Sequence, residues 1–346
     1  MPSSQKALFL EKKLGNIVLK ETEIYKPGPG EVLIKIKSTS LNPVDWKIQK
    51  LGVFVENYPI ILGSDVAGDV VELGEGVTEF KKGDKVYCQG QFENDKASFQ
   101  EYTLALASTL ARIPPDISYD GAAALPVALS VAFVALYNHN PHGLGITPPF
   151  SEDAQGKYAG TPFVVIGGSS SVGQLVLQLA KLSGFSPIIT TSSTKQTDFL
   201  KSLGATYVVD RDLPAAQLKA EIDKITGDKP IKYICDSISS ETTQKVALDV
   251  LAPGGQLAVV YPQDVTVPED KTRLAALGIL RLPHNVELLE TLYHDKMYGW
   301  LEKGIIKPNN VKVLPGGLRG IPDGLVSLEK GEVSGLKLVV HPQDTV

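Results

Sequence analysis

One stretch in the middle of the chain limits the possible fold more than any other: PFVVIGGSSSVGQLVLQLAKL, residues 162–182. A short apolar run at 163–166 enters a turn of glycine and serine, and apolar residues then recur at helical spacing as far as Leu182. This order predicts a strand, a tight turn and a helix. Such a turn directs backbone N–H groups and the N-terminus of a helix at one point, where a diphosphate binds.

The glycines of this turn match a dinucleotide-binding fingerprint with one departure. The fingerprint places glycine at the turn, at the approach of the phosphates and at the contact between helix and strand. Gly168 and Gly173 take the first and last places, and Ser170 takes the middle one.

The residues after this helix indicate which dinucleotide is bound. Proteins that prefer NAD usually place Asp or Glu about 20 residues after the turn, where it holds the ribose hydroxyls. Here a second apolar run ends in Thr191, Ser192 and Ser193, with Lys195 close behind and no acidic residue before Asp198. Hydroxyls and an ammonium group donate hydrogen bonds and positive charge to a 2′-phosphate, so the sequence predicts NADPH as cofactor.

Strands and helices then alternate as far as residue 261, with strand-like runs at 205–210, 232–238 and 256–261. This alternation predicts an α/β fold with a doubly wound parallel sheet and right-handed crossovers. Residues 5–108 instead show about six strand signals broken by glycine turns, without a convincing helix, which predicts a compact β-rich domain.

Other segments carry weaker patterns. Residues 119–139 are alanine-rich and apolar on most sides, which predicts one buried helix in which Ser130 is a satisfied helix hydroxyl. Residues 140–160 are rich in Gly and Pro and are expected to form a long surface loop. An amphipathic helix ending at a glycine is predicted over 287–304.

Composition and charge limit the functional classes. A chain of 346 residues favours two domains, and a net charge of −5 without any block of Lys or Arg argues against nucleic acid or an anionic membrane as partner. No apolar run reaches the length of a membrane span, and the first residues lack the apolar core of a signal peptide, so we expect a cytoplasmic protein. Cys88 and Cys235 lie in strand-like runs and are expected to be small core residues, not a disulfide or a zinc site.

Motifs over the whole length are shared with one known family. They include PGPGEVLIKIKSTSLNPVDWKI, PIILGSDVAGDVVELGEGV, GAAALPVALSVAFVAL, VVIGGSSSVGQLVLQLAKLSG and KGEVSGLKLVV, in this order. The chain resembles the zinc-independent enoyl and quinone reductases of the medium-chain dehydrogenase/reductase superfamily, above all fungal trans-acting enoyl reductases and ToxD-like proteins. The resemblance implies a GroES-like β-rich catalytic domain, residues 1–126 and 285–346, with a Rossmann NADP(H)-binding domain inserted at 127–284. It also implies a small-molecule substrate in the cleft between them.

The residues at the zinc positions of that superfamily differ from those of its metal-dependent members. These members have a cysteine soon after the run LIKIKSTS and a His-Glu pair after LG, where this chain has Asn42-Pro43-Val44-Asp45 and Gly63-Ser64-Asp65. Ser and Asp do not replace a thiolate and an imidazole, so zinc-dependent alcohol oxidation is disfavoured. His139 and His142 have no acidic or thiol companion nearby and are expected to be exposed.

The favoured function is therefore zinc-independent, NADPH-dependent hydride delivery to an activated C=C bond (enone, enal or enoyl thioester) or to a quinone. The cofactor supplies the hydride, while the protein positions and polarises the substrate. Two alternatives stay open: an NADPH-dependent aldehyde reductase, and a non-catalytic NADPH-binding protein. A polyketide synthase partner is open, as is a homodimer paired through the apolar run at 274–280, which equally suits an internal segment.

The resemblance also assigns the residues of the site. Tyr58 is the one candidate proton donor. Arg211 would stack on adenine or pair with phosphate, although it and Lys47 also suit ordinary surface charges, and Asp45 also suits a helix cap. The expected cofactor-binding set is Asp45, Trp46, Lys47, Ile48, Ser130, Gly167, Gly168, Ser169, Ser170, Ser171, Val172, Gly173, Ser192, Ser193, Lys195, Arg211, Gly254, Gly255, Ser334 and Gly335.

Overall fold

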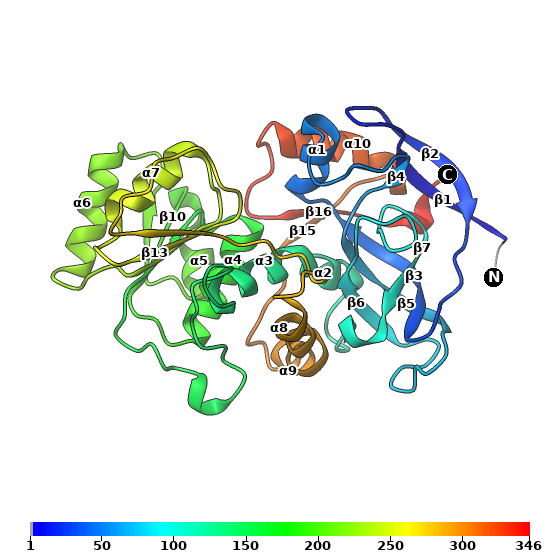
Figure 1. Cartoon of the computed structure of the whole chain (residues 1–346), viewed down its shortest axis with the longest axis horizontal. Coiled ribbons are helices and arrows are strands. Elements are labelled where there is room, and N and C mark those ends of the chain that lie inside the picture. The colour runs from blue at the N-terminus through cyan, green and yellow to red at the C-terminus, as the bar shows by residue number, and fades with distance from the viewer. Residues whose placement is uncertain (1–2) are drawn as a thin grey trace. The chain divides into compact units, whose positions relative to one another are not determined.

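The computed structural model describes residues 3–346, and the chain divides into two compact units. Unit 1 contains the described residues up to Val127, together with Glu290–Lys303 and Pro308–Val346. Unit 2 contains Ala128–Leu289 and Gly304–Lys307. Figure 1 shows both units and labels those helices and strands for which there is room. Among the described residues, no helix is both long and apolar enough to cross a membrane.

Unit 1 is built mainly from antiparallel strands. One sheet has the order β15-β16-β3-β5-β6-β8, with β7 also paired to β3, and a smaller sheet has the order β2-β1-β4. The strands are β1 (Ser4–Leu10), β2 (Ile17–Glu23), β3 (Glu31–Ser40), β4 (Ile60–Ile61), β5 (Asp65–Leu73), β6 (Lys85–Gln89), β7 (Tyr102–Leu106), β8 (Ala111–Arg112), β15 (Val311–Val313) and β16 (Lys337–Val340). The predicted β-rich domain is confirmed, and strand β16 from the end of the chain joins it.

The helices of unit 1 are short: α1 (Pro43–Leu51), α2 (Tyr119–Ala123), α9 (Met297–Glu302) and α10 (Ile321–Glu329). Helix α1 follows β3 directly, begins with Pro43 and ends at Gly52, whose φ of 65° suits glycine. Its buried Ile48 belongs to an apolar core that also contains Ile321 and Leu325 of α10.

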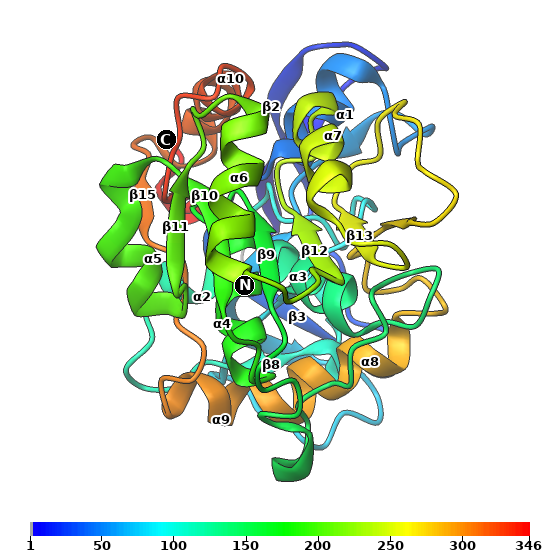
Figure 2. The same ribbon diagram turned by 90° about the vertical axis from the view of Figure 1, so that its left-hand side faces the viewer.

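Unit 2 holds a six-stranded sheet in which every pair of neighbours is parallel, in the order β11-β10-β9-β12-β13-β14. This is the strand order of a dinucleotide-binding fold, and it confirms the predicted doubly wound sheet, seen in Figure 2. The strands are β9 (Phe163–Ile166), β10 (Ile188–Ser192), β11 (Tyr207–Asp210), β12 (Tyr233–Asp236), β13 (Gln256–Val259) and β14 (Thr272–Ala275).

Helices cover this sheet in two groups. The helices are α3 (Pro126–Tyr137), α4 (Ser171–Leu182), α5 (Thr197–Leu203), α6 (Ala215–Thr226), α7 (Glu241–Val250) and α8 (Val286–Glu290). Helix α4 packs against α5, and α6 packs against α7. Right-handed crossovers in this strand order place the two pairs on opposite faces. On one of these faces Val164 and Ile234 of the sheet form a core with Leu218 of α6 and Leu248 of α7.

Three predicted elements differ in the structure. The single helix over 119–139 is two helices, because Pro126 lacks a backbone N–H and starts a new one. The helix over 287–304 is interrupted by a π-helical segment, Thr291–Lys296. The apolar run at 274–280 contributes only its first two residues to the edge strand β14. A Cβ on Gly278 would lie 2.4 Å from the backbone nitrogen of Val131, so the rest of this run packs closely against α3.

Candidate cofactor site

The turn between β9 and α4 has the form that the sequence predicts. Ser170 is the N-cap of α4, and its Oγ accepts a hydrogen bond of 2.9 Å from the backbone N–H of Gly173. The same hydroxyl donates to Oγ of Ser237 at 3.0 Å. Serine at the middle position of the fingerprint is therefore a helix cap, a role that glycine fills less well.

Three positions of this turn are glycine because neighbouring atoms leave no room for a Cβ. A Cβ on Gly167, which has a φ of 79°, would lie 2.3 Å from Cγ1 of Ile238. A Cβ on Gly168 would lie 2.1 Å from Oγ1 of Thr190, and one on Gly173 would lie 2.2 Å from the carbonyl oxygen of Gly167. The three glycines are buried, so the turn lies close to its neighbours at the N-terminus of a 12-residue helix, where backbone N–H groups suit a diphosphate.

A cavity of about 240 Å³ lies at the carboxyl ends of β9, β10 and β12, beside this turn. Ser192, the last residue of β10, lines it, and its Oγ is buried without a hydrogen-bond partner among the described residues. A buried hydroxyl without a partner is costly unless a ligand or water completes it. The cavity is lined by Ile166, Gly167, Ser169, Thr191, Ser192, Arg211, Asp212, Leu213, Ala215, Leu218, Ile238, Thr242, Thr243 and Val246.

Arg211 supplies the positive charge of this cavity. Its backbone N–H donates a 3.0 Å hydrogen bond to the carbonyl oxygen of Ser192. Its guanidinium lies 3.7 Å from a carboxylate oxygen of Asp212, and both side chains are more than half exposed, so this ion pair holds it weakly. Lys195 is exposed in the 3₁₀ turn after β10, and neither it nor Ser193 lines the cavity.

The structure corrects the prediction for Gly254 and Gly255. They immediately precede β13, whereas the phosphate turn follows β9, and β9 and β13 run parallel through β12. The two glycines therefore lie at the amino edge of the sheet, opposite the cofactor edge. Gly254, with a φ of 71°, forms the tight connection from α7 to β13.

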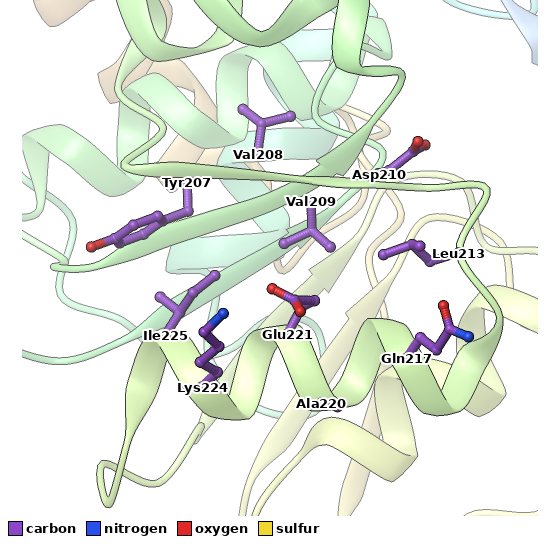
Figure 3. A pocket seen from close by; sticks show the side chains of 10 residues that line it. All are labelled: Tyr207, Val208, Val209, Asp210, Leu213, Gln217, Ala220, Glu221, Lys224 and Ile225. Atoms are coloured by element: carbon purple, nitrogen blue, oxygen red, sulfur yellow. The ribbon is translucent and has the colours of Figure 1, made fainter.

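A larger groove of about 880 Å³ lies elsewhere in unit 2, along the edge strand β11 and helix α6. Figure 3 shows its side chains, which come from β11, α6 and the connection between them and include Tyr207, Glu221 and Lys224. It contains no residue of the phosphate turn and shares only Leu213 with the cavity beside Ser192. The smaller cavity is therefore the candidate cofactor site.

Helix α1 of unit 1 contains four predicted site residues, and two of them are accessible to solvent. Asp45 and Ile48 are fully buried, while Trp46 and Lys47 are partly exposed, with Nζ of Lys47 5.8 Å from the centroid of the Trp46 ring. Burial lowers the pKa of the Lys47 ammonium. Oδ2 of Asp45 accepts a 2.8 Å hydrogen bond from the backbone N–H of Asn42, so Asp45 caps α1. Burial raises the pKa of this carboxyl to about 7.

The residues at the zinc positions of the family form a different kind of centre. Nζ of Lys337 lies 2.6 Å from Oδ2 of Asp65 and 3.0 Å from Oδ1 of Asn42. An ammonium group thus already binds the oxygens that a metal would need. Within residues 3–346, no group of three or more His, Cys, Asp or Glu side chains is arranged to hold a metal ion.

The remaining predicted residues are found in varied surroundings. The hydroxyl of Tyr58 donates to the carbonyl oxygen of Val55 at 3.1 Å. Ser130 is fully buried in α3. Ser334 and Gly335 form the turn before β16, where Gly335 has a φ of 72°.

The two histidines after α3 are not alike. His139 is exposed as predicted, but His142 is half-buried because its ring stacks on that of His284, with centroids 3.5 Å apart.

Sequence reasoning missed the residues that follow β12. Ser237 donates hydrogen bonds to the carbonyl oxygens of Ile166 and Gly167, at 2.6 and 3.0 Å, and Ile238 lies against the glycine turn. Only their position could have indicated a role at this site. They follow β12, the strand next to β9, at the same edge of a parallel sheet.

Comparisons with known proteins agree with this geometry. The model of the alcohol dehydrogenase GroES-like domain matches residues 28–115, and that of the zinc-binding dehydrogenases matches 171–271. A trans-enoyl reductase of Aspergillus japonicus is 32% identical, over 90% of this chain and 89% of its own. A dehydrogenase of Emericella nidulans is 30% identical, over 98% and 99%.

A solved structure, a putative zinc-dependent alcohol dehydrogenase of Rhizobium etli, has a TM-score of 0.83 at 21% identity, over 99% of both chains. At this identity the likeness shows the fold alone. The chain belongs to the medium-chain dehydrogenase/reductase superfamily of oxidoreductases, with fungal trans-enoyl reductases among its relatives.

Proposed function

We propose that this protein is a zinc-independent, NADPH-dependent reductase that delivers hydride to an activated C=C bond, in an enone, enal or enoyl thioester, or to a quinone. The names of its fungal relatives support reduction of an enoyl group. One observation carries the choice of cofactor. The Ser192 hydroxyl, which is buried without a hydrogen-bond partner among the described residues, lines the same cavity as Arg211.

The cavity suits the 2′-phosphate of NADPH for a chemical reason. No acidic residue stands at the end of β10, where NAD-binding proteins place Asp or Glu, and Ser192 offers a hydroxyl there instead. Arg211 offers a planar fork of N–H donors, which matches phosphate oxygens. Asp212 lines the same cavity and lies 3.7 Å from the Arg211 guanidinium, but its side chain is 79% exposed, so solvent screens its charge.

In this proposal, the residues of the chain bind the cofactor and orient it. The glycine turn and the N-terminus of α4 hold the diphosphate through backbone N–H groups, and Ser192 with Arg211 holds the 2′-phosphate. The nicotinamide, when bound, supplies the hydride. Trp46, Lys47, Ser334 and Gly335 are the proposed unit 1 residues beside it, and Tyr58 remains the proposed proton donor once its O–H leaves the carbonyl oxygen of Val55.

Zinc independence rests on the donor set. Asp65 accepts hydrogen bonds from Lys337, Asn42, Ser40 and the backbone of Val127, so its carboxylate is fully engaged. Asn42 and Ser64 supply neither a thiolate nor an imidazole.

A binding experiment tests the cofactor assignment. We would titrate the purified apoprotein with NADPH and NADH, following nicotinamide fluorescence, and repeat it with Arg211→Ala and Lys195→Ala. Arg211 lines the cavity and Lys195 does not. We therefore expect Arg211→Ala to abolish the preference for NADPH and Lys195→Ala to retain it. Equal binding of both cofactors by the unmodified protein would reject the phosphate pocket.

Turnover then separates the proposed activity from its alternatives. Reduction of enones or quinones supports the proposal, and reduction of aldehydes alone identifies an aldehyde reductase. Binding of NADPH without any turnover identifies a nucleotide-binding protein.

A further inference from the structure

A lysine and an aspartate form an ion pair inside unit 1, away from solvent. Lys337, the first residue of β16, is 3% exposed, and Asp65, the first residue of β5, is completely buried. Their Nζ and Oδ2 atoms lie 2.6 Å apart. By comparison, the lysine side chain is 19% exposed in the Lys96–Glu31 pair and 42% exposed in the Lys219–Asp223 pair.

Asp65 joins four separate segments of the chain. Its Oδ2 also accepts hydrogen bonds from Ser40 at the end of β3 and from Nδ2 of Asn42, the latter at 2.7 Å. Its Oδ1 accepts from the backbone N–H of Val127 at 2.7 Å, in the first turn of α3. Lys337 brings in the C-terminal strand.

These segments carry the proposed cofactor contacts of unit 1. Asn42 is the N-cap of α1, so it fixes the start of the helix that presents Trp46 and Lys47. Lys337 follows the turn that contains Ser334 and Gly335 by two residues. Lys337 also donates to Oδ1 of Asn42 at 3.0 Å, so the two segments are tied to each other directly as well as through Asp65.

Such a pair is poorly explained by stability alone. The cost of removing both charges from water is comparable with their attraction, and apolar side chains of similar volume often serve stability as well or better. What a buried, fully hydrogen-bonded network adds is a single fixed geometry.

We propose that Lys337 and Asp65 are positioning residues for hydride delivery, because together they hold α1 and the 334–335 turn in the arrangement that the reaction requires. This inference rests on the proposed function. A shift of about 1 Å in such groups is enough to lower a rate about a hundredfold.

The test removes both charges together, because Lys337→Met alone would leave a buried carboxylate unpaired and endanger folding. The double variant Asp65→Asn/Lys337→Met is compared with Lys219→Met/Asp223→Asn. The latter removes an exposed pair on α6 whose Nζ and Oδ2 atoms are 2.5 Å apart. Measurements are kcat, KM, NADPH affinity and amide hydrogen exchange, all well below the melting temperature.

For the buried pair we expect kcat to fall about a hundredfold. NADPH affinity is expected to fall much less than kcat, because the proposed 2′-phosphate contacts, Ser192 and Arg211, belong to unit 2. Amides of α1 and of residues 334–340 should exchange faster. The control variant should match the unmodified protein in all four measurements.

A second variant covers the case in which the double variant does not fold. Asn42→Ser keeps a good N-cap residue for α1. The serine side chain is too short to reach Lys337 and Asp65, so the variant removes the hydrogen bonds between α1 and the ion pair while the ion pair itself stays intact. We expect the same loss of kcat and the same faster exchange in α1.

Unchanged kcat and unchanged exchange in a folded double variant, or in Asn42→Ser, would overturn the inference. A lower melting temperature with full kcat would overturn it too, since that result describes a pair that only stabilises. Absence of turnover by the unmodified protein would instead reject the proposed function.

Discussion

The side chain of Arg211 lines the same cavity as the buried hydroxyl of Ser192, and the backbone N–H of Arg211 donates a 3.0 Å hydrogen bond to the Ser192 carbonyl oxygen. Ser192 ends β10 and Arg211 directly follows the neighbouring parallel strand β11, so the sheet fixes the separation of their backbones. Under the proposed function, the Ser192 hydroxyl and the Arg211 guanidinium bind the 2′-phosphate of NADPH.

Ser192→Ala should weaken NADPH binding by roughly tenfold or more, because a hydrogen bond to a charged phosphate is lost. NADH affinity should change much less, since its ribose carries no phosphate at this position. Ser202→Ala, which removes an exposed hydroxyl from α5, is the matched control. Calorimetric titration of each variant with both cofactors measures the difference, and an equal loss for NADPH and NADH would contradict the assignment.

Gly173→Ala should destabilise the fold by about 1–3 kcal/mol and abolish cofactor binding, because its Cβ would lie 2.2 Å from the carbonyl oxygen of Gly167. Gly299→Ala in α9 is the control, since a Cβ there has no atom within 4 Å. Thermal unfolding and NADPH fluorescence report the two effects. Normal NADPH binding by Gly173→Ala would show that the turn is not the diphosphate site.

The carboxyl of Asp45 predicts a pH dependence of stability. Its pKa is raised from 3.8 to about 7: burial and the charge of Asp65 raise it, while backbone hydrogen bonds from Asn42 and Gly63 and the charge of Lys337 lower it. A folded-state pKa above the unfolded one stabilises the fold fully below about pH 4, and this contribution is lost as the pH rises through about 7.

Asp45→Asn keeps an oxygen for the N–H of Asn42 but does not ionise. The free energy of unfolding of the variant, minus that of the unmodified protein, should therefore increase between pH 5 and pH 8. Denaturant unfolding at both values measures it, and a constant difference would mean that Asp45 does not titrate in this range.

Removal of metal should leave the activity intact. Prolonged dialysis against a strong zinc chelator is expected to change neither kcat nor KM, because Lys337 already occupies the oxygens of Asp65 and Asn42. A zinc-dependent alcohol dehydrogenase treated in parallel is the positive control. Activity that disappears on dialysis and returns with added zinc would contradict zinc independence.

The sequence predicted those features that depend on local pattern. The alternation of strands and helices predicted the parallel sheet, and the glycine spacing predicted the turn after β9. Even the departure at Ser170 has a local cause, since it caps the helix that follows.

Features that depend on how distant segments meet were not accessible. Gly254 and Gly255 were assigned to the cofactor from their type, but the direction of β13 puts them at the other edge of the sheet. Lys195 and Arg211 were both candidates for the phosphate, and only the pairing of β10 with β11 brings one of them beside Ser192. The contact of Lys337 with Asp65 spans 272 positions in sequence, and no periodicity predicts it.

The most direct test of the proposed activity follows the hydride itself. The protein is incubated with a simple enone and NADPH deuterated at C4 of the nicotinamide, and the product is examined by nuclear magnetic resonance. Deuterium at the β-carbon of a saturated ketone is the predicted result. Recovery of the unchanged enone, or deuterium only at the carbonyl carbon of an alcohol, would contradict it.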